Sequence, residues 1–196
     1  MSLSEFAQDA RGQREMLRAE RAARGEPALA PEREWCVAAY RLEAAGFPSG
    51  AADAWREALA LDASIAQAHL GLARSLISLS DGEGAAAACR RAIEEDGRAR
   101  AGGREGLLDD PDEDPWYCLG LAEHLCGRFD AAAEAYRRSA RDYPWFAEPM
   151  YELARVEAAR GDRAAAGEAA RQALRRARWR PEFAREVQTL LDGIGA

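Results

Sequence analysis

The chain of 196 residues contains no lysine and no asparagine, so all 27 of its basic residues are arginine. The absence of lysine excludes Schiff-base chemistry and the lysine-dependent phosphate loop of nucleotide hydrolases. β-branched residues are also few, whereas alanine, leucine, arginine and glutamate dominate. Because alanine and straight-chain side chains lose little entropy in a helix, this composition predicts an all-α protein.

Long apolar runs and an excess of positive charge are also missing. No hydrophobic stretch approaches the roughly 20 residues that a bilayer-spanning helix requires, and the amino terminus shows no apolar core of a secretory signal. The formal net charge of −7 disfavours nucleic acid, because contacts with phosphate supply most of that affinity. We therefore expect a cytoplasmic protein that binds neither nucleic acid nor membrane.

Candidates for catalysis or metal binding are scarce. The cysteines at 36, 89, 118 and 126 form no C-x-x-C pair and are expected to be packed thiols. A metal site formed by His124 with Cys118 and Cys126 is disfavoured, because about 240° of helical rotation separates His124 from Cys118 and no fourth ligand is evident. His69 is expected to be a packed core residue. With no nucleophile–base–acid set, the sequence predicts no enzyme, no cofactor and no metal.

A period of 34 residues organises most of the chain. Aligning Trp35 with Trp116 brings further glycine, alanine and aromatic positions into register. The matched pairs are Gly46 with Gly127, Ala51 with Ala132, and Trp55 with Tyr136. Steps of 34 residues then give four units in one frame, at 32–65, 66–99, 113–146 and 147–180. Four units in phase are strong evidence for a repeat protein.

This pattern resembles the tetratricopeptide repeat family, a helix–turn–helix unit with W-x₂-L-G-x₂-Y, then small residues, an aromatic and a proline. The third unit matches the pattern best. It contains Trp116, Leu119, Gly120, Gly127, Phe129, Ala132, Tyr136 and Pro144. The resemblance covers about 136 of the 196 residues. It implies a right-handed α-solenoid of four repeats.

Residue size fits such a packing. Small residues recur where two helices must approach closely, and large ones fill the spaces between them. The small set is 39, 51, 73, 85, 120, 132, 154 and 166, and the large set is Trp35, Trp55, Trp116 and Tyr136. We expect Trp116 to be buried between its own two helices and the preceding unit. Gly46, Gly127 and Gly161 are predicted to end the first helix of their units.

The segments at the two ends of the array are predicted to be helical. In 1–31, Ser2 and Glu5 form a capping box for a helix over 3–24. Its apolar start (Leu3, Phe6, Ala7, Ala10) is expected to pad the first repeat, while the side that carries Arg11, Arg14, Arg18 and Arg21 stays in solvent. At 181–196, Phe183, Val187, Leu190 and Leu191 share one face of a helix that is expected to cap the last repeat.

An insertion at 100–112 separates the second unit from the third. It is rich in glycine and then in acidic residues, which predicts a solvated loop, with Asp114 capping a helix that begins at Pro115. Two alternatives remain open. The D-x-D-x-D pattern at 110–114 is similar to a calcium loop, although Pro115 replaces the required glycine. Leu107 and Leu108 could instead bind a partner or dock on the chain itself.

The family resemblance also implies a binding surface. In this family the first helix of each pair lines a concave face and presents its second, fifth, sixth, ninth and twelfth positions to a partner. The candidate residues at such positions are Arg33, Tyr40, Gln67, Arg74, Tyr117, Leu121, Tyr151 and Arg155. Five of them, Tyr40, Arg74, Tyr117, Tyr151 and Arg155, are expected to face one continuous groove. Some members of the set could instead pack between repeats.

The chemistry of these positions suggests a class of partner. Family members that clamp a C-terminal carboxylate use lysine and asparagine there, and this chain has neither. Tyrosine, arginine and aliphatic side chains suit an apolar or amphipathic polypeptide segment. We therefore expect a scaffold or chaperone-like adaptor that binds another protein. A self-associating structural protein and a non-catalytic subunit of an enzyme complex remain alternatives.

Overall fold

The computed structural model describes residues 9–103 and 114–195, and the chain divides into two compact units, Met1–Leu108 and Asp109–Ala196. All regular structure in the described ranges is helical, which confirms the predicted fold class. Some predictions fall outside these ranges. They concern Ser2, Leu3, Glu5, Phe6, Ala7, Leu107, Leu108 and positions 110–113.

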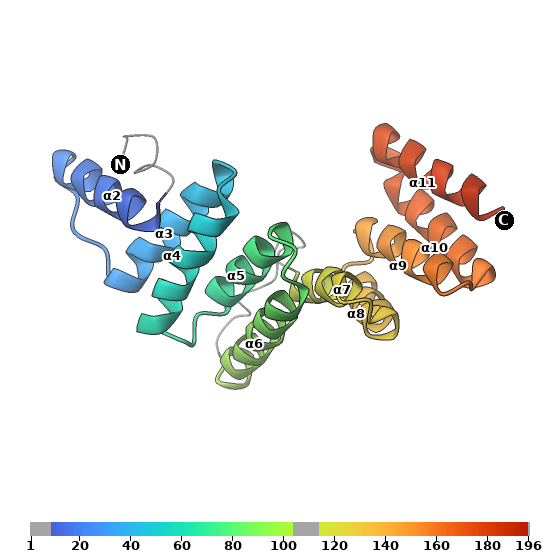
Figure 1. The fold of residues 1–196 in the computed structure, drawn as a ribbon, viewed down its shortest axis with the longest axis horizontal. Helices are drawn as coiled ribbons and strands as arrows, with labels where there is room; N and C mark the ends of the chain where they lie inside the picture. The colour runs from blue at the N-terminus through green and yellow to red at the C-terminus, as the bar shows by residue number, and fades with distance from the viewer. Residues whose placement is uncertain (1–8, 104–113, 196) are drawn as a thin grey trace. The chain divides into compact units, whose positions relative to one another are not determined.

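In the described part of unit 1, residues 9–103, a single helix is followed by two helical hairpins (Figure 1). The elements are α2 (Ala10–Ala23), α3 (Pro31–Ala44), α4 (Pro48–Leu61), α5 (Ala66–Ser78) and α6 (Gly82–Ala101). Helix α6 runs two residues past the predicted end of the second repeat. Ion pairs one turn apart support this extension, from Arg98 to Glu94 (2.5 Å) and from Arg100 to Asp96 (2.7 Å).

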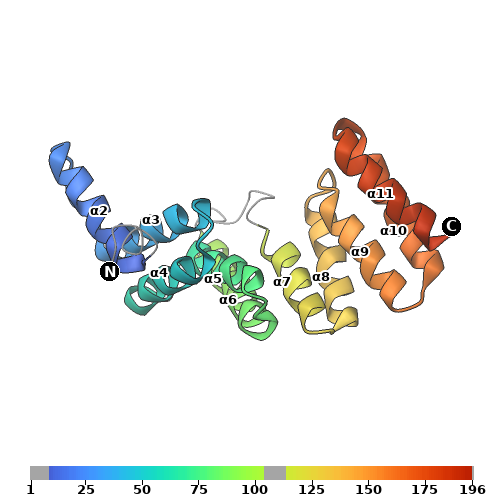
Figure 2. The same cartoon turned by 45° about the horizontal axis from the view of Figure 1, so that its top comes forward.

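The described residues of unit 2, 114–195, form two hairpins and a final helix, which lie side by side in chain order in both views (Figures 1 and 2). The elements are α7 (Pro115–Leu125), α8 (Phe129–Asp142), α9 (Glu148–Ala159), α10 (Arg163–Arg176), the short 3₁₀ turn η2 (Ala177–Trp179) and α11 (Pro181–Ile194). Proline stands in the first turn of α7, α9 and α11, where its missing N–H leaves no hydrogen bond unmade.

The helix boundaries follow from capping residues that the sequence identified. Gly46, Gly127 and Gly161 have φ angles of 78°, 70° and 83°, the left-handed conformation that ends a helix at low cost for glycine. Asp114 is buried, and its carboxylate accepts a hydrogen bond from the Trp116 N–H at 2.9 Å. The predicted cap of α7 is therefore confirmed.

Each unit has its own core of alanines packed around a large aromatic side chain. Trp55 in unit 1 and Tyr136 in unit 2 are fully buried. The predicted small positions are buried as well. The prediction for Trp116 is wrong: this residue is only half-buried, and the guanidinium of Arg138 lies 5.6 Å from the centre of its ring.

Helix α2 differs from its prediction in where it begins and in what holds it. Its N-cap is Asp9, so within the described residues the helix starts at Ala10. The expectation that its arginine side stays in solvent is only partly right, because Arg11 and Arg18 are exposed whereas Arg14 and Arg21 are half-buried. Arg14 and Arg18 both pair with the carboxylate of Glu34 on α3, at 2.8 and 2.7 Å, and the Glu34 side chain is only 4% exposed. Leu17, which lies about one turn of α2 after Arg14, is also buried.

Helix α11 covers the end of unit 2, as the predicted fold requires. Val187 and Leu191 are buried in the same cluster as residues of α8, α9 and α10. Phe183 and Leu190 pack against that cluster while remaining half-exposed. The helix therefore closes the core with one face and leaves part of its apolar surface accessible.

Candidate partner-binding surfaces

In unit 1, the candidate residues Tyr40 and Arg74 are connected through Glu43 and Trp55. The Tyr40 and Trp55 rings meet edge to face, with a centroid distance of 4.8 Å. The Trp55 indole N–H donates to Glu43 at 2.9 Å, and Arg74 donates to the other carboxylate oxygen of Glu43 at 3.1 Å. Ser75 also donates to Glu43, at 3.2 Å. Glu43 thus fixes Arg74 next to the buried tryptophan.

The surface beside Glu43 is hollowed. A cavity of about 420 Å³ is lined by Glu43, Gly46, Pro48, Arg74, Ser75 and Ser78. Tyr40 is 40% exposed, Arg33 is exposed, and Gln67 is half-buried. Among the candidates of unit 1, Tyr40 therefore offers an accessible aromatic ring, while Arg74 already satisfies a carboxylate of its own chain.

In unit 2, Tyr117 and Leu121 project from α7 against the core. The Tyr117 ring lies 6.0 Å from that of Tyr136 and 5.3 Å from that of Phe146, centre to centre. Leu121 packs against the same cluster. Burial, followed by the nearby charges of Glu152 and Glu148, raises the pKa of the Tyr117 phenol above its ordinary value. Both residues are half-buried and pack on the core cluster, so we expect replacement of Tyr117 to cost stability as well as any binding.

Tyr151 and Arg155 project from α9. Arg155 pairs with Glu152 at 2.9 Å and lies 6.0 Å from the centre of the Tyr151 ring. Its side chain remains 48% exposed. The opposite edge of this surface comes from α11, where Phe183 meets Tyr151 at 5.3 Å between ring centres. Arg155 is therefore an accessible cation beside the Tyr151 ring, which in turn contacts Phe183.

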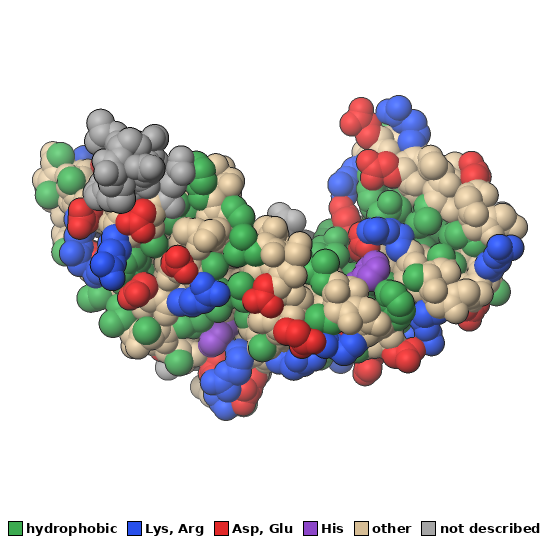
Figure 3. Space-filling model, viewed as in Figure 1, with side chains coloured by type: hydrophobic (Ala, Val, Ile, Leu, Met, Phe, Trp, Pro, Cys, Tyr) green, Lys and Arg blue, Asp and Glu red, His purple; other side chains and the backbone are tan. Residues whose placement is uncertain are grey.

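A larger cavity of about 700 Å³ lies between α9 and α11. Its lining is mainly apolar, with a few polar groups. The lining residues are Tyr151, Ala158, Arg163, Glu186, Thr189, Leu190, Gly193 and Ile194. Figure 3 shows hydrophobic side chains exposed on this part of unit 2, with charged side chains around them. A cavity of this size and lining can hold a few apolar side chains of a ligand.

The sequence missed the contribution of α11 to this surface. The four-repeat frame assigned 181–196 only to capping. One more step of 34 residues would have placed Glu186 and Thr189 on the sixth and ninth positions of a further first helix. Both line the cavity. The expectation that Tyr40, Arg74, Tyr117, Tyr151 and Arg155 share one continuous groove stays a prediction.

The surroundings of the two histidines and of Cys36 are those of residues with a packing role. His69 is buried, and its Nε2 lies 2.9 Å from the Ala63 carbonyl oxygen. Burial lowers the pKa of His124, whose ring meets Phe129 at 5.7 Å. Burial raises the pKa of the Cys36 thiol to about 11, which leaves it unreactive at neutral pH. In ranges 9–103 and 114–195, no group of three or more His, Cys, Asp or Glu residues could hold a metal ion.

Comparison with solved structures decides the fold. A crystal structure titled MamA superposes with a TM-score of 0.68 at 20% sequence identity, covering 88% of this chain and 89% of its own. The Cut9–Hcn1 hetero-tetramer of the APC/C gives 0.71 at 16% identity, with 85% of this chain and 30% of the Cut9–Hcn1 chain covered. The chain has a tetratricopeptide-repeat fold. A MamA fragment from Desulfovibrio magneticus RS-1 is also similar, with a TM-score of 0.66, 16% identity, and 87% and 85% coverage.

Comparison of the amino-acid sequence with protein families and curated proteins gives no further information on this chain. No family model matches the chain, and no curated protein does. Within the described helices, none is long and apolar enough to cross a membrane. The sequence identity to these solved structures is 20% or less, so the comparison shows only that the helical pairs share the same arrangement.

Proposed function

We propose that the chain is a cytoplasmic, non-catalytic adaptor that binds an apolar or amphipathic segment of another protein. The observation that carries this proposal is the surface between α9 and α11. There, a cavity of about 700 Å³ is bordered by Tyr151, Leu190 and Ile194. Arginine and tyrosine are the residue types that most often supply binding energy at protein interfaces, and Arg155 stands next to Tyr151.

The side chains at this surface favour an amphipathic partner over a purely acidic one. Arg155 is already paired with Glu152, and Glu186 also lines the cavity. The apolar members supply most of the contact area, and the charged ones fix orientation. The four cysteines, all within the described residues, form no disulfide bond, which suits the reducing cytoplasm. Nothing in this surface requires a catalytic group.

Calorimetry with selected peptides tests the proposal. Amphipathic peptides would be selected from a display library on the native chain, and affinity would then be measured for Arg155→Ala. Because Arg155 is half-exposed, we expect a loss of about 1–3 kcal/mol, or roughly ten- to a hundredfold in affinity. A modest loss of stability should accompany it, because the buried Glu152 carboxylate loses its partner. Tyr151→Ala should weaken binding as well, with some loss of stability because Tyr151 packs on the core.

Arg171→Ala is the matched control. Arg171 pairs with Glu168 three residues earlier, as Arg155 does with Glu152, and its side chain is 44% exposed, but it stands on α10 rather than beside Tyr151 of α9. The Arg171→Ala variant should bind the selected peptides with the same affinity as the native chain. Equal losses for Arg155→Ala and Arg171→Ala would reject this surface. Light scattering that shows a stable oligomer, with the surface occupied by a second copy, would favour the self-associating alternative.

A further inference from the structure

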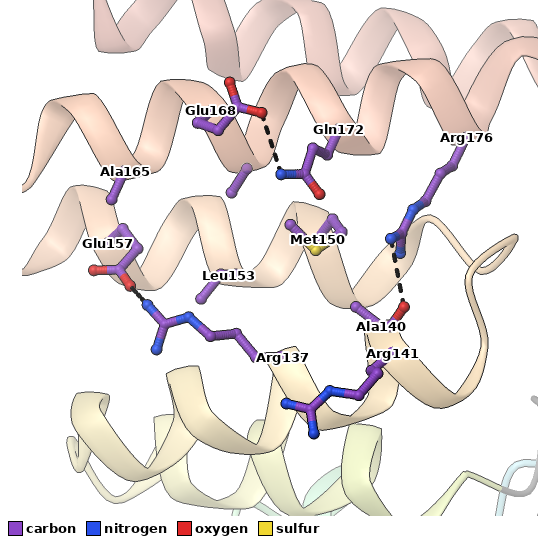
Figure 4. A pocket seen from close by; sticks show the side chains of 11 residues that line it. Arg137, Ala140, Arg141, Met150, Leu153, Glu157, Ala165, Glu168, Gln172 and Arg176 are labelled. Atoms are coloured by element: carbon purple, nitrogen blue, oxygen red, sulfur yellow. Dashed lines mark hydrogen bonds and ion pairs between the residues drawn. The ribbon is translucent and has the colours of Figure 1, made fainter.

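A second groove lies on a different face of unit 2, between α8 and α10, with α9 as its floor (Figure 4). Its volume is about 390 Å³. The floor is formed by Met150 and Leu153, which stand on the side of α9 away from Tyr151 and Ala158. Ala140 and Ala169 border it. The groove can therefore take one or two apolar side chains without disturbing the cavity between α9 and α11.

One end of this groove carries positive charge that the described chain leaves without a carboxylate. Arg141 lines the groove and makes no hydrogen bond or ion pair with any described residue. Arg176 donates only to carbonyl oxygens in the described structure, those of Phe146 at 3.1 Å and Ala140 at 3.4 Å. Burial, and next the neighbouring Arg175, lowers the pKa of Arg176, as expected for a guanidinium without a compensating anion.

The other charges near the groove are already matched. Arg137 pairs with Glu157, and Arg160 pairs with the second carboxylate oxygen of Glu157 at 2.8 Å. Glu168 accepts a hydrogen bond from Gln172 at 3.2 Å and lies near Arg171 and Arg175. Asp142 pairs with Arg138 at 2.8 Å. The unmatched charge is thus confined to the end formed by Arg141 and Arg176.

Two exposed tryptophans stand next to this basic end. Trp145 is 66% exposed and Trp179 is 79% exposed, and they are separated by one repeat of 34 residues. Arg176 ties the carboxyl end of α10 to the Phe146 carbonyl, and Arg180 pairs with Glu148, so the two loops that carry the indoles are held together. At the same repeat position, unit 1 has Ser64 and Arg98. The indoles are therefore specific to unit 2.

We propose that this groove binds a segment of a partner protein in which a carboxylate is followed by an apolar or aromatic side chain. Arg141 and Arg176 would receive the carboxylate in charge-assisted hydrogen bonds. The apolar side chain would lie on Met150 and Leu153, while Trp145 and Trp179 would cover the segment where it leaves the groove. Exposed tryptophan beside arginine is the composition of binding hot spots. This site is independent of the proposed adaptor surface between α9 and α11.

The test uses the full chain and two synthetic peptides. One peptide repeats Asp-Phe-Glu-Leu, and the other has Asn and Gln in place of Asp and Glu. Calorimetry should show binding of the acidic peptide that weakens with added salt and at least about fivefold weaker binding of the uncharged one. Arg141→Gln should weaken the acidic peptide by a similar factor without a change in melting, because Arg141 makes no contact that holds the described fold together.

Matched controls and further variants keep the result decisive. Arg185→Gln removes the same charge from a side chain on α11 that is 77% exposed, and it should leave the affinity unchanged. Trp145→Ser and Trp179→Ser should each weaken binding with little effect on melting, since both indoles are exposed. Arg155→Ala should not affect this peptide, which separates the site from the surface between α9 and α11.

Several outcomes would overturn the proposal. These are equal affinity of the two peptides, equal effects of Arg141→Gln and Arg185→Gln, or no binding up to about 1 mM of acidic peptide. Binding to anionic lipid vesicles without binding to the peptide would assign the tryptophans and arginines to a membrane surface. Self-association that Arg141→Gln abolishes, with no affinity for the peptide, would assign them to a second copy of the chain.

Discussion

Gly71 and Gly120 occupy points at which an aromatic ring lies directly on a helix backbone. A Cβ atom at Gly71 would come within 2.3 Å of the Trp55 ring, and one at Gly120 within 2.4 Å of the Tyr136 ring. Both rings are fully buried and have no room to move away. The two glycines therefore have a packing role that is separate from helix propensity, which alone would favour alanine.

We expect Gly71→Ala and Gly120→Ala to destabilise the chain by about 1–3 kcal/mol, the usual cost of overpacking a core. Gly97→Ala is the control, because Gly97 lies within α6 with nothing near its missing Cβ. That change should stabilise by about 0.5–1 kcal/mol through helix propensity. Denaturant unfolding measures all three, and a stabilising effect of Gly71→Ala or Gly120→Ala would show that the rings can shift.

The two tryptophans that the repeat frame aligned show what can be predicted from position alone. Trp35 and Trp116 occupy the same repeat position, yet Trp35 is 5% exposed and Trp116 is half-buried. Trp35 is covered by the Arg14 guanidinium, 4.5 Å from its ring centre. The frame identifies a large residue at this point of the fold. Its burial depends on the neighbouring element, which the repeat pattern does not describe.

At the scale of helices, α2 is held by a pair of arginines on one buried carboxylate. The Arg18 hydrogen bond holds the pKa of Glu34 below its ordinary value, with a further contribution from Arg14. A lowered carboxyl pKa in the folded state stabilises docking above the unfolded pKa of about 4.3, and this contribution is lost as the pH falls through the folded value. Acidification should therefore loosen α2 before the cores of the two units unfold.

Glu34→Gln should have the same effect at neutral pH. Loss of the carboxylate leaves Arg14 and Arg18 without their partner, so hydrogen exchange over 10–23 should accelerate by about tenfold or more. Glu20→Gln is the control, because the Glu20–Arg41 pair also joins α2 to α3 but is exposed, and such pairs contribute little. Unchanged exchange in Glu34→Gln would mean that Leu17 and Ala10 alone hold the helix.

The same helix shows where sequence reasoning stops. A run of arginines on one side indicated a solvated face, which is the usual case for isolated charges. The partner, Glu34, lies 16 and 20 residues further along the chain from Arg18 and Arg14, on another helix. Local periodicity carries no information about such a pairing. By contrast, the ends of α3, α7 and α9 were predictable, because each depends on a glycine next to the helix.

For the whole molecule, each unit has a hydrophobic cluster of its own. We expect calorimetry to resolve two unfolding transitions. Leu42→Ala removes a fully buried side chain from unit 1 and should lower only one of them, while Leu153→Ala, which is 5% exposed in unit 2, should lower only the other. Each change should cost about 2–5 kcal/mol in its own unit.

A single transition that both substitutions shift together would contradict this expectation. It would show that the two units unfold as one cooperative block.

The repeat frame predicted which helices pair within each unit. The break in that frame also located the insertion at 100–112, and the division between residues 108 and 109 falls within it. The family pattern assigns candidate positions to the first helix of each repeat, whereas the groove of Arg141 and Arg176 lies on faces to which the pattern assigns none.

The placement of the tryptophans also gives the protein an internal optical signal. Trp35 and Trp55 are buried in unit 1, whereas Trp145 and Trp179 in unit 2 are largely in water. Indole emission shifts to longer wavelength in water and is quenched by solutes that reach the ring. The red, quenchable part of the emission therefore reports mainly on the α8–α10 edge of unit 2, and the blue, protected part reports mainly on the core of unit 1, while the half-buried Trp116 of α7 adds an intermediate contribution. A single unlabelled sample can thus distinguish occupation of that edge from melting of the other unit.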